Sequence, residues 1–270
     1  MIARGSWWAQ PPANVILLQD DVHVWCASLD QPASGLQWLA QTLSADERVR
    51  AERFYFEQDG MRFIVGRGLL RIILGYYLGI EPSELRFCYS SRGRPTLAET
   101  TGGNRIRFNL AHSLGLALYA VTLGREIGVD LECIRIIDKT EQIVDRFFSD
   151  REKAVFRALP LNKKYEAFFT YWTCKEAYLK ACGEGLSQPL DQIDVLLVPG
   201  EPTRLLSIKG DVREASRWSL QELRPASGFA AALVVEGHSY CLSCWQWSQW
   251  PPIAAASVHS VLRSTAHIGA

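Results

Sequence analysis

The amino-acid sequence predicts an α+β fold built from two pseudo-symmetric halves, because one set of local signals occurs twice. Each half contains a Ser-x-x-Glu capping box, at residues 44–47 and again about 105 residues later at 149–152. A short charged helix and then a longer apolar helix follow each box. After each long helix comes a strand-like stretch, and then a strand of small apolar residues. Mixed helices and mostly antiparallel strands are therefore expected.

The first half is expected to cover residues 1–124. Its long helix is predicted at residues 61–78, and Gly79 supplies a typical helix end. Alternation of apolar and polar residues, or runs of apolar residues between turn signals, predict the strands. The expected strands of this half cover residues 15–18, 22–26, 84–89 and 113–122.

The second half is expected to cover residues 125–250 and repeats the pattern. Its long helix is predicted at residues 165–182 and ends at Gly183. Residues 251–270 contain Pro, Ala, Ser and His without periodicity, so a weakly ordered tail is expected there. The expected strands cover residues 127–132, 192–198, 227–235 and 245–247, the last as a closing edge strand.

Composition limits the classes of function. Apolar residues make up 48% and charged residues 21%, which is ordinary for a globular domain. The net charge of zero gives no support to nucleic-acid binding, and no apolar run is long enough to span a membrane. The seven cysteines are scattered, and the N-terminus lacks a secretory pattern. A cytoplasmic protein with reduced thiols is expected, and a monomer.

An acidic strand and a lysine-bearing helix carry the clearest chemical signal. The expected strand at residues 127–132 has period two, so Asp130 and Glu132 share one face. In the second long helix, Glu176 and Lys180 lie one turn apart. Three carboxylates suit Mg²⁺, which usually binds protein carboxylates together with substrate phosphate. A nearby ammonium suits phosphate as well.

Each of these features has a simpler structural explanation. Asp130 and Glu132 could face solvent on a half-buried strand, which is the usual cause of such alternation. Glu176 and Lys180 could form a surface pair worth roughly 0.2–0.5 kcal/mol. The pair explanation does not account for the neighbouring Trp172, so metal binding is the preferred hypothesis.

Four motifs give the chain a family resemblance over about residues 44–235. It resembles the two-domain 4′-phosphopantetheinyl transferases, which activate carrier proteins of peptide, polyketide and fatty-acid synthesis. The order and spacing of the four motifs make the resemblance specific. The motifs are Gly93-Arg94-Pro95, Phe108-Asn109-Leu110-Ala111-His112-Ser113, Ile127-Gly128-Val129-Asp130-Leu131-Glu132 and the Trp172-Thr173-Cys174-Lys175-Glu176-Ala177-Tyr178-Leu179-Lys180 helix with its Gly-rich exit.

The resemblance implies an active site in the cleft between the halves. The family moves the 4′-phosphopantetheine group of coenzyme A to a serine of an apo acyl- or peptidyl-carrier protein and releases 3′,5′-ADP. By motif position, Asp130, Glu132 and Glu176 would bind Mg²⁺. Glu176 and Lys180 would be catalytic, and Lys180 would also contact coenzyme A.

Further positions match the family's contacts to the nucleotide end of coenzyme A. Arg94 stands where the family usually has lysine, and Ala111 stands where it commonly has serine. A buried structural role is the alternative for His112, and most other arginines of the first half are expected to be solvated. The implied cofactor-binding residues are Arg50, Arg62, Arg94, Asn109, His112 and Lys180.

The carrier protein is expected to dock on exposed apolar and basic residues around residues 146–156. Glu152 lies in this segment, and its capping-box role already accounts for it. Two other classes of function compete with the transferase. One is a Mg²⁺-dependent hydrolase of coenzyme A or nucleotide diphosphates, which would use water as nucleophile and need no carrier. The other is a non-catalytic binding module.

Overall fold

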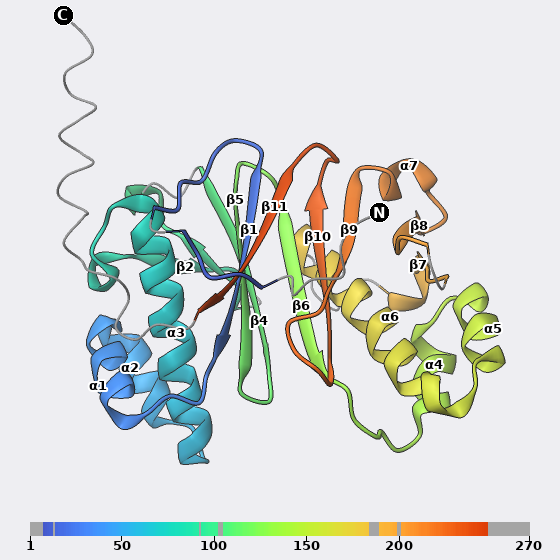
Figure 1. The fold of residues 1–270 in the computed structure, drawn as a ribbon, viewed down its shortest axis with the longest axis horizontal. Helices are drawn as coiled ribbons and strands as arrows, with labels where there is room; N and C mark the ends of the chain where they lie inside the picture. Colours follow the sequence, from blue (N-terminus) through green and yellow to red (C-terminus); the bar gives the residue numbers. More distant parts are fainter. Residues whose placement is uncertain are drawn as a thin grey trace, which may run out of the picture.

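The computed structural model describes residues 8–12, 14–91, 93–101, 105–183, 189–198 and 201–247 of the 270-residue chain. In these residues two β-sheets form the centre and helices cover their outer faces (Figure 1). This confirms the predicted α+β class. The helices are α1 (Ala33–Thr42), α2 (Ala45–Glu52), α3 (Glu57–Leu78), α4 (Thr140–Phe147), α5 (Asp150–Ala158), α6 (Leu161–Cys182) and α7 (Val212–Ala215).

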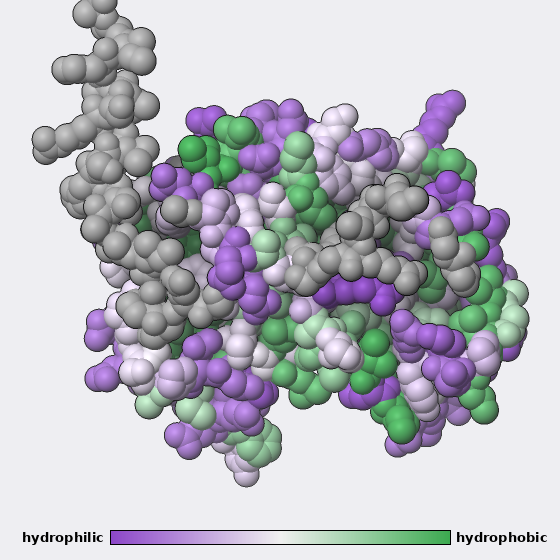
Figure 2. Space-filling model, viewed as in Figure 1, coloured by the Kyte–Doolittle hydropathy of each residue, from purple (hydrophilic) through white to green (hydrophobic). Residues whose placement is uncertain are grey.

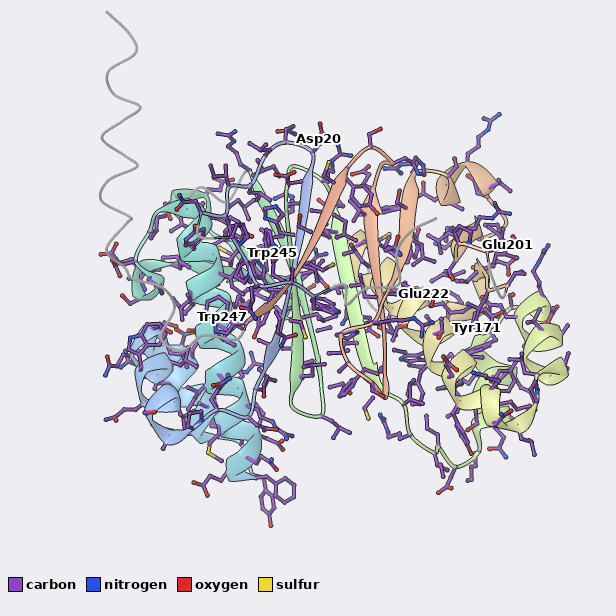
Figure 3. The ribbon with its side chains drawn as sticks, in the orientation of Figure 1. Asp20, Tyr171, Glu201, Glu222, Trp245 and Trp247 are labelled. Carbon is purple, nitrogen blue, oxygen red and sulfur yellow. The ribbon has the colours of Figure 1, made fainter. Side chains whose placement is uncertain are left out.

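The first sheet has the strand order β11-β1-β5-β4. Neighbouring strands are antiparallel except β11, which runs parallel to β1 at the edge. The predicted edge strand at residues 245–247 is thus part of β11, and it joins the sheet of the first half. Figure 3 shows Trp245 and Trp247 of β11 on the side that faces α3. The strands are β1 (Asp21–Ser28), β4 (Ile106–Ser113), β5 (Leu116–Leu123) and β11 (Cys241–Trp247).

The second sheet has the order β6-β10-β9 and is antiparallel. Two small hairpins lie outside the main sheets, one in each half. The division of the chain at residue 124 stays a prediction, and β11 shows that the second range contributes a strand to the first sheet. The remaining strands are β6 (Ile127–Cys133), β9 (Trp218–Leu223), β10 (Phe229–Glu236), β2 (Phe87–Tyr89), β3 (Pro95–Leu97), β7 (Ile193–Leu196) and β8 (Arg204–Ile208).

The two main sheets pack face to face through a shared apolar core. On β1, Trp25 and Ala27 face α3, whereas Val24 and Cys26 face the second sheet. On β6, Val129 belongs to this same core between the sheets. Both faces of the central strands are therefore buried, which explains why they read as nearly continuous apolar runs.

Helix ends follow the predicted local chemistry. Ser44 and Ser149 head capping boxes with glutamates three residues later. Gly79 and Gly183 end the two long helices in the left-handed conformation, at φ values of +65° and +72°. Both long helices begin four residues earlier than predicted, and α6 follows Pro160, which is suited to a helix start.

One predicted strand is wrong. Residues 15–18 form no strand. The Val15 amide donates to the Tyr76 hydroxyl at 2.8 Å, and the Leu18 amide donates to the Asp21 carboxylate at 2.8 Å. Side chains therefore satisfy backbone groups that a neighbouring strand would otherwise have paired. The predicted tail at residues 251–270 lies outside the described residues.

The surface mixes polar and apolar side chains (Figure 2). Among the described helices, none is long and apolar enough to cross a membrane. All seven cysteines are free thiols, as their scattered spacing predicts. Cys241 and Cys244 of β11 differ in exposure, the first exposed and the second buried, so they are poorly placed to act together.

Candidate active site

Strand β6 and helix α6 lie in very close contact, and Gly128 makes this possible. A Cβ atom at Gly128 would meet the Ala177 carbonyl oxygen at 2.0 Å and the Ala181 nitrogen at 2.4 Å. Only glycine therefore allows the helix backbone to approach the strand at this point. The contact brings the acidic residues of β6 beside Glu176 and Lys180.

Lys180 binds Asp130, one of the predicted metal ligands, directly. Its Nζ atom lies 2.7 Å from Asp130 Oδ1 and donates to the Val129 carbonyl oxygen at 3.2 Å. The Asp130 side chain is only 8% exposed and that of Lys180 is 30% exposed. The simpler explanation paired Lys180 with Glu176 on the helix surface, but the lysine reaches across to the strand instead.

The Glu176 carboxyl group experiences a strongly unfavourable environment for negative charge. Burial raises its pKa to about 7, and the carboxylates of Asp130 and Glu132 add to the shift while Lys180 opposes it. Asp130 Oδ2 is buried and has no hydrogen-bond partner. Both observations identify a place where additional positive charge would be stabilised.

Glu132 is held by a residue whose role the sequence interpretation missed. The Ser113 hydroxyl donates to Glu132 Oε2 at 3.2 Å and accepts from the Cys133 amide at 3.1 Å. Arg135 forms a longer ion pair with Glu132, at 3.5 Å. Ser113 directly follows His112 at the end of β4, so its motif position was the available signal.

The residues present fit a hard divalent cation in their chemistry. The donors are carboxylate oxygens, and one of them, Asp130 Oδ2, is an orphaned buried acceptor. As placed, no three His, Cys, Asp or Glu side chains of the described residues converge into a compact ligand group. Binding would therefore require Glu132 or Glu176 to turn toward Asp130.

Two residues of the Asn-x-x-His motif have different surroundings. His112 is exposed, yet desolvation lowers its pKa, with a smaller effect of the Lys180 ammonium in the same direction. Asn109 is buried, and its Oδ1 accepts from the Val129 amide at 3.0 Å. Asn109 thus joins β4 of the first half to the acidic strand β6, whereas His112 is accessible to a ligand.

The arginines predicted to meet phosphate are not equivalent. Arg50 is exposed, and its guanidinium carbon lies 5.2 Å from the Phe63 ring centroid. Arg62 forms an ion pair with Asp30 at 2.8 Å. Arg50 is therefore accessible to an anion, whereas Arg62 would have to leave or share its carboxylate.

Two other arginines are more buried than expected. Arg67 is not solvated, because it is 9% exposed and lies 3.4 Å from Glu47 among aromatic rings. Arg94 donates through Nη1 to the Lys180 carbonyl oxygen at 2.6 Å. The resemblance placed Arg94 on coenzyme A, but this terminal nitrogen already has a backbone partner.

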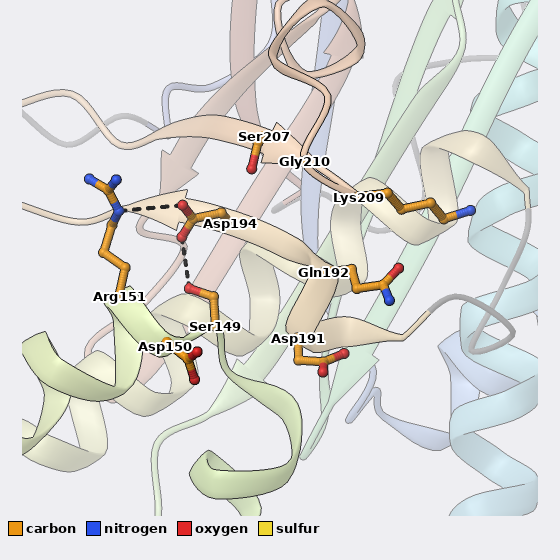
Figure 4. A pocket seen from close by; sticks show the side chains of 9 residues that line it. All are labelled: Ser149, Asp150, Arg151, Asp191, Gln192, Asp194, Ser207, Lys209 and Gly210. Atoms are coloured by element: carbon orange, nitrogen blue, oxygen red, sulfur yellow. Dashed lines mark hydrogen bonds and ion pairs between the residues drawn. The ribbon is translucent and has the colours of Figure 1, made fainter.

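The described residues contain a polar pocket between the start of α5 and the β7–β8 hairpin (Figure 4). The Ser149 hydroxyl donates to Asp194 at 2.8 Å, and Arg151 lies 3.4 Å from the same carboxylate. None of the predicted site residues lines this pocket. Its lining residues are Ser149, Asp150, Arg151, Asp191, Gln192, Asp194, Ser207, Lys209 and Gly210.

The pocket borders the segment predicted to receive a carrier protein. In residues 146–156, Arg146 and Arg151 are exposed and Val155 is 38% exposed. Phe156 is fully buried, so it belongs to the core and does not contribute an exposed apolar contact.

Comparisons with known proteins identify relatives of both halves of the chain. Residues 126–234 match the 4′-phosphopantetheinyl transferase superfamily, and residues 30–123 match the N-terminal domain of 4′-phosphopantetheinyl transferases. The chain is 47% identical over 240 residues to the 4′-phosphopantetheinyl transferase HetI of a Nostoc species, covering 89% of this chain and 98% of that protein.

Two more distant relatives extend the comparison. The chain is 30% identical to the 4′-phosphopantetheinyl transferase Sfp of Bacillus subtilis, over 57% of this chain and 66% of Sfp. It is 24% identical to the human L-aminoadipate-semialdehyde dehydrogenase-phosphopantetheinyl transferase, over 70% of this chain and 66% of that protein. The chain therefore belongs to the 4′-phosphopantetheinyl transferase superfamily and is a two-domain phosphopantetheinyl transferase.

Proposed function

We propose that the protein transfers the 4′-phosphopantetheine group of coenzyme A to a serine of an apo acyl- or peptidyl-carrier protein, with Mg²⁺, and releases 3′,5′-ADP. One observation supports this most strongly: Lys180 and the partnerless oxygen of Asp130 lie together beside Glu176. A cation site next to an ammonium suits a diphosphate better than a neutral substrate.

In the proposed reaction the serine oxygen attacks the pantetheine-side phosphorus of coenzyme A. The new P–O bond joins the carrier to phosphopantetheine, and the broken P–O bond releases 3′,5′-ADP. Lys180 would stabilise the charge that develops on the leaving phosphate, because its ammonium is already fixed at Asp130. Glu176 would accept the serine proton, directly or through water, because its carboxyl group lies beside Asp130 and Lys180.

Asp130, Glu132 and Glu176 would hold the metal. When bound, Mg²⁺ would neutralise the diphosphate and polarise the attacked phosphorus. Ser113 would orient Glu132 through the hydroxyl contact at 3.2 Å. Of these ligands, Asp130 is buried and Glu132 lies nearer to solvent, with side chains 8% and 28% exposed.

The nucleotide end of coenzyme A would lie along the first half. Arg50 and His112 are exposed and available to phosphate, and Arg62 would contribute if it released Asp30. Asn109 would serve this end indirectly, by holding β4 against Val129. Arg94, which motif position also assigns to coenzyme A, would reach it only by releasing the Lys180 carbonyl oxygen that its Nη1 now holds.

The carrier protein would dock beside the site, on the second half around residues 146–156. Exposed Arg146 and Arg151 suit an acidic partner, although Arg151 is partly engaged by Asp194. We further propose that the protein acts as a cytoplasmic monomer, since its free thiols suit a reducing compartment.

Mass spectrometry of an apo carrier protein tests the proposal. Incubation with this protein, coenzyme A and Mg²⁺ should add one phosphopantetheine group to the carrier serine and form 3′,5′-ADP. Both products should be lost when EDTA replaces Mg²⁺. Consumption of coenzyme A at the same rate without carrier would instead indicate the hydrolase. If coenzyme A did not react either with or without carrier, the non-catalytic binding module would be the better explanation.

A further inference from the structure

Arg94 joins the two structural elements that carry the site. Its Nη1 donates to the Lys180 carbonyl oxygen at 2.6 Å, and its Nη2 makes a longer bond of 3.4 Å to the Ile127 carbonyl oxygen. Lys180 belongs to the last turn of α6, and Ile127 is the first residue of β6. Arg94 itself precedes β3 of the first half. One guanidinium thus joins helix, strand and the opposite half.

The end of α6 is shaped to receive this guanidinium. Gly183 has a left-handed conformation, and a Cβ atom there would lie 3.2 Å from Arg94 Nη1. The space that a side chain would otherwise fill is therefore taken by Arg94. Helix carbonyls near a C-terminus lack partners within the helix and carry partial negative charge, so a cation is stabilised there.

Lys180 is consequently held both by its backbone and by its side chain. Arg94 binds its backbone carbonyl, while its Nζ atom binds Asp130 Oδ1 and the Val129 carbonyl. The contact of Gly128 with Ala177 and Ala181 lies between these two attachments. A shift of the last turn of α6 would therefore move the ammonium away from the position next to Asp130.

We propose that Arg94 is a positioning residue, which places the Lys180 ammonium by fastening the end of α6 to β6. This inference rests on the proposed transferase function. It differs from the contact with coenzyme A that motif position implies, because both terminal nitrogens of Arg94 are directed to backbone carbonyls. It also gives a reason for arginine at this position, since a lysine ammonium cannot reproduce the two-pronged fork.

Steady-state kinetics of Arg94→Ala, Arg94→Lys and Arg50→Ala separates the two roles. A positioning role predicts that Arg94→Ala lowers kcat by about 10- to 100-fold, as loss of a supporting contact commonly does. Its KM for coenzyme A and its preference for coenzyme A over the 3′-dephospho form should stay within about twofold of wild type. Arg94→Lys should recover only part of kcat. Arg50→Ala, the matched control for a nucleotide contact, should raise KM and reduce the preference.

A binding measurement shows whether Arg94→Ala still folds into a form that binds coenzyme A. Calorimetric titration of Arg94→Ala with coenzyme A, below its melting temperature, should give a Kd within about twofold of wild type. A raised Kd or KM for coenzyme A with kcat unchanged would overturn the positioning role and restore the direct contact. Unchanged kcat and KM in Arg94→Ala would overturn it as well. Failure of the wild-type protein to modify any carrier would instead overturn the proposed function, and this inference with it.

Discussion

Lys175 and Glu152 form an ion pair at 2.7 Å in the core of the second half, and neither side chain is more than 1% exposed. Lys175 Nζ also donates to the carbonyl oxygens of Leu190 and Ile193, at 2.8 and 2.6 Å. Glu152 accepts from the Val195 amide at 2.9 Å. The pair therefore ties α5 and α6 to the start of β7.

The first half repeats this arrangement with different residues. Glu47 pairs with Arg71 at 2.7 Å, and Arg71 donates to the carbonyl oxygens of Pro82 and Leu85 at 2.8 and 3.1 Å. In both halves a capping-box glutamate binds a cation of the long helix, which in turn binds the segment after that helix. The duplication therefore extends to the buried charges, and Lys175 of the Lys-Glu motif serves the fold.

Replacing Lys175 by methionine should destabilise the protein by about 3–5 kcal/mol, because it leaves Glu152 buried without its cation. The matched control is Lys163→Met in the same helix, since Lys163 is 59% exposed and its pair with Glu166 is at the surface. The control should cost less than about 1 kcal/mol. Urea unfolding followed by circular dichroism measures both. Equal losses in the two variants would show that the buried pair adds nothing.

Lys180→Ala should lower kcat/KM for coenzyme A by about 10²-fold, by analogy with the loss of other electrostatic stabilisers. Lys180→Arg should restore only part of the rate, because a planar guanidinium does not replace a compact ammonium beside Asp130. Carrier modification at saturating Mg²⁺ measures all three proteins. If wild type and Lys180→Ala gave the same kcat/KM, the lysine would have only its structural contact with β6.

Gly128→Ala should destabilise the protein by about 1–3 kcal/mol, because the added methyl group would overlap the α6 backbone. Gly66→Ala in α3 is the matched control, since its Cβ would find Leu29 Cδ2 at 3.6 Å, an ordinary contact. Alanine is also the better helix former, so the control should be neutral or stabilising. Thermal unfolding of the two variants makes the comparison, and a Gly128→Ala melt at or above that of Gly66→Ala contradicts it.

His23 predicts a specific pH dependence of stability. It is 3% exposed, faces Trp245, and lies 3.7 Å from Asp21. Its Nδ1 lies 2.8 Å from the Tyr77 hydroxyl, which accepts from Trp25 Nε1 and so has its own proton to donate to His23. The histidine is therefore neutral in the fold, and burial lowers its pKa from 6.5 to about 4.

Because the unfolded chain binds this proton more readily, stability contributed by neutral His23 is present above pH 6.5 and is lost as pH falls toward 4. The loss should reach about 3 kcal/mol at most. His23→Gln keeps a polar group but does not titrate. Urea unfolding between pH 4 and 7 should therefore show a difference between wild type and His23→Gln that changes across this window. A constant difference would show that His23 does not titrate with folding.

Local sequence patterns predicted the parts of the fold that depend on local chemistry. The period of residues 127–132 placed Asp130 and Glu132 on one face, and the structure turns that face toward α6. Capping boxes and terminal glycines located the long helices to within four residues. These features depend on neighbours in sequence, so they can be read without knowing the tertiary contacts.

Contacts between distant residues could not be read in this way. Nothing near Lys180 indicates that its partner is Asp130, and nothing near Arg94 indicates the end of α6. Charge and motif position gave Arg50 a phosphate contact and left Arg67 among the arginines expected to be solvated, whereas packing buries Arg67 and leaves Arg50 exposed. On a long helix, solvent-facing and buried arginines can be told apart only when the elements that pack against the helix are known.

The chain passes between the two sheets twice, and both connections lie at the same end of the sheets. Residues 124–126 lead from β5 to β6, and residues 237–240 lead from β10 to β11. Arg125 connects both crossings, because it donates to the Glu236 and Ser239 carbonyl oxygens and pairs with Asp20 at 2.6 Å. Ser113 of β4 and Glu132 of β6 lie at the other end of the two sheets, away from Arg125.

The two sheets are thus fastened together at this end by both crossings and by the contacts of Arg125. At the other end the Ser113–Glu132 hydrogen bond links β4 of the first sheet to β6 of the second. The buried core between the sheets is therefore closed by covalent connections at one end and by a side-chain contact at the other.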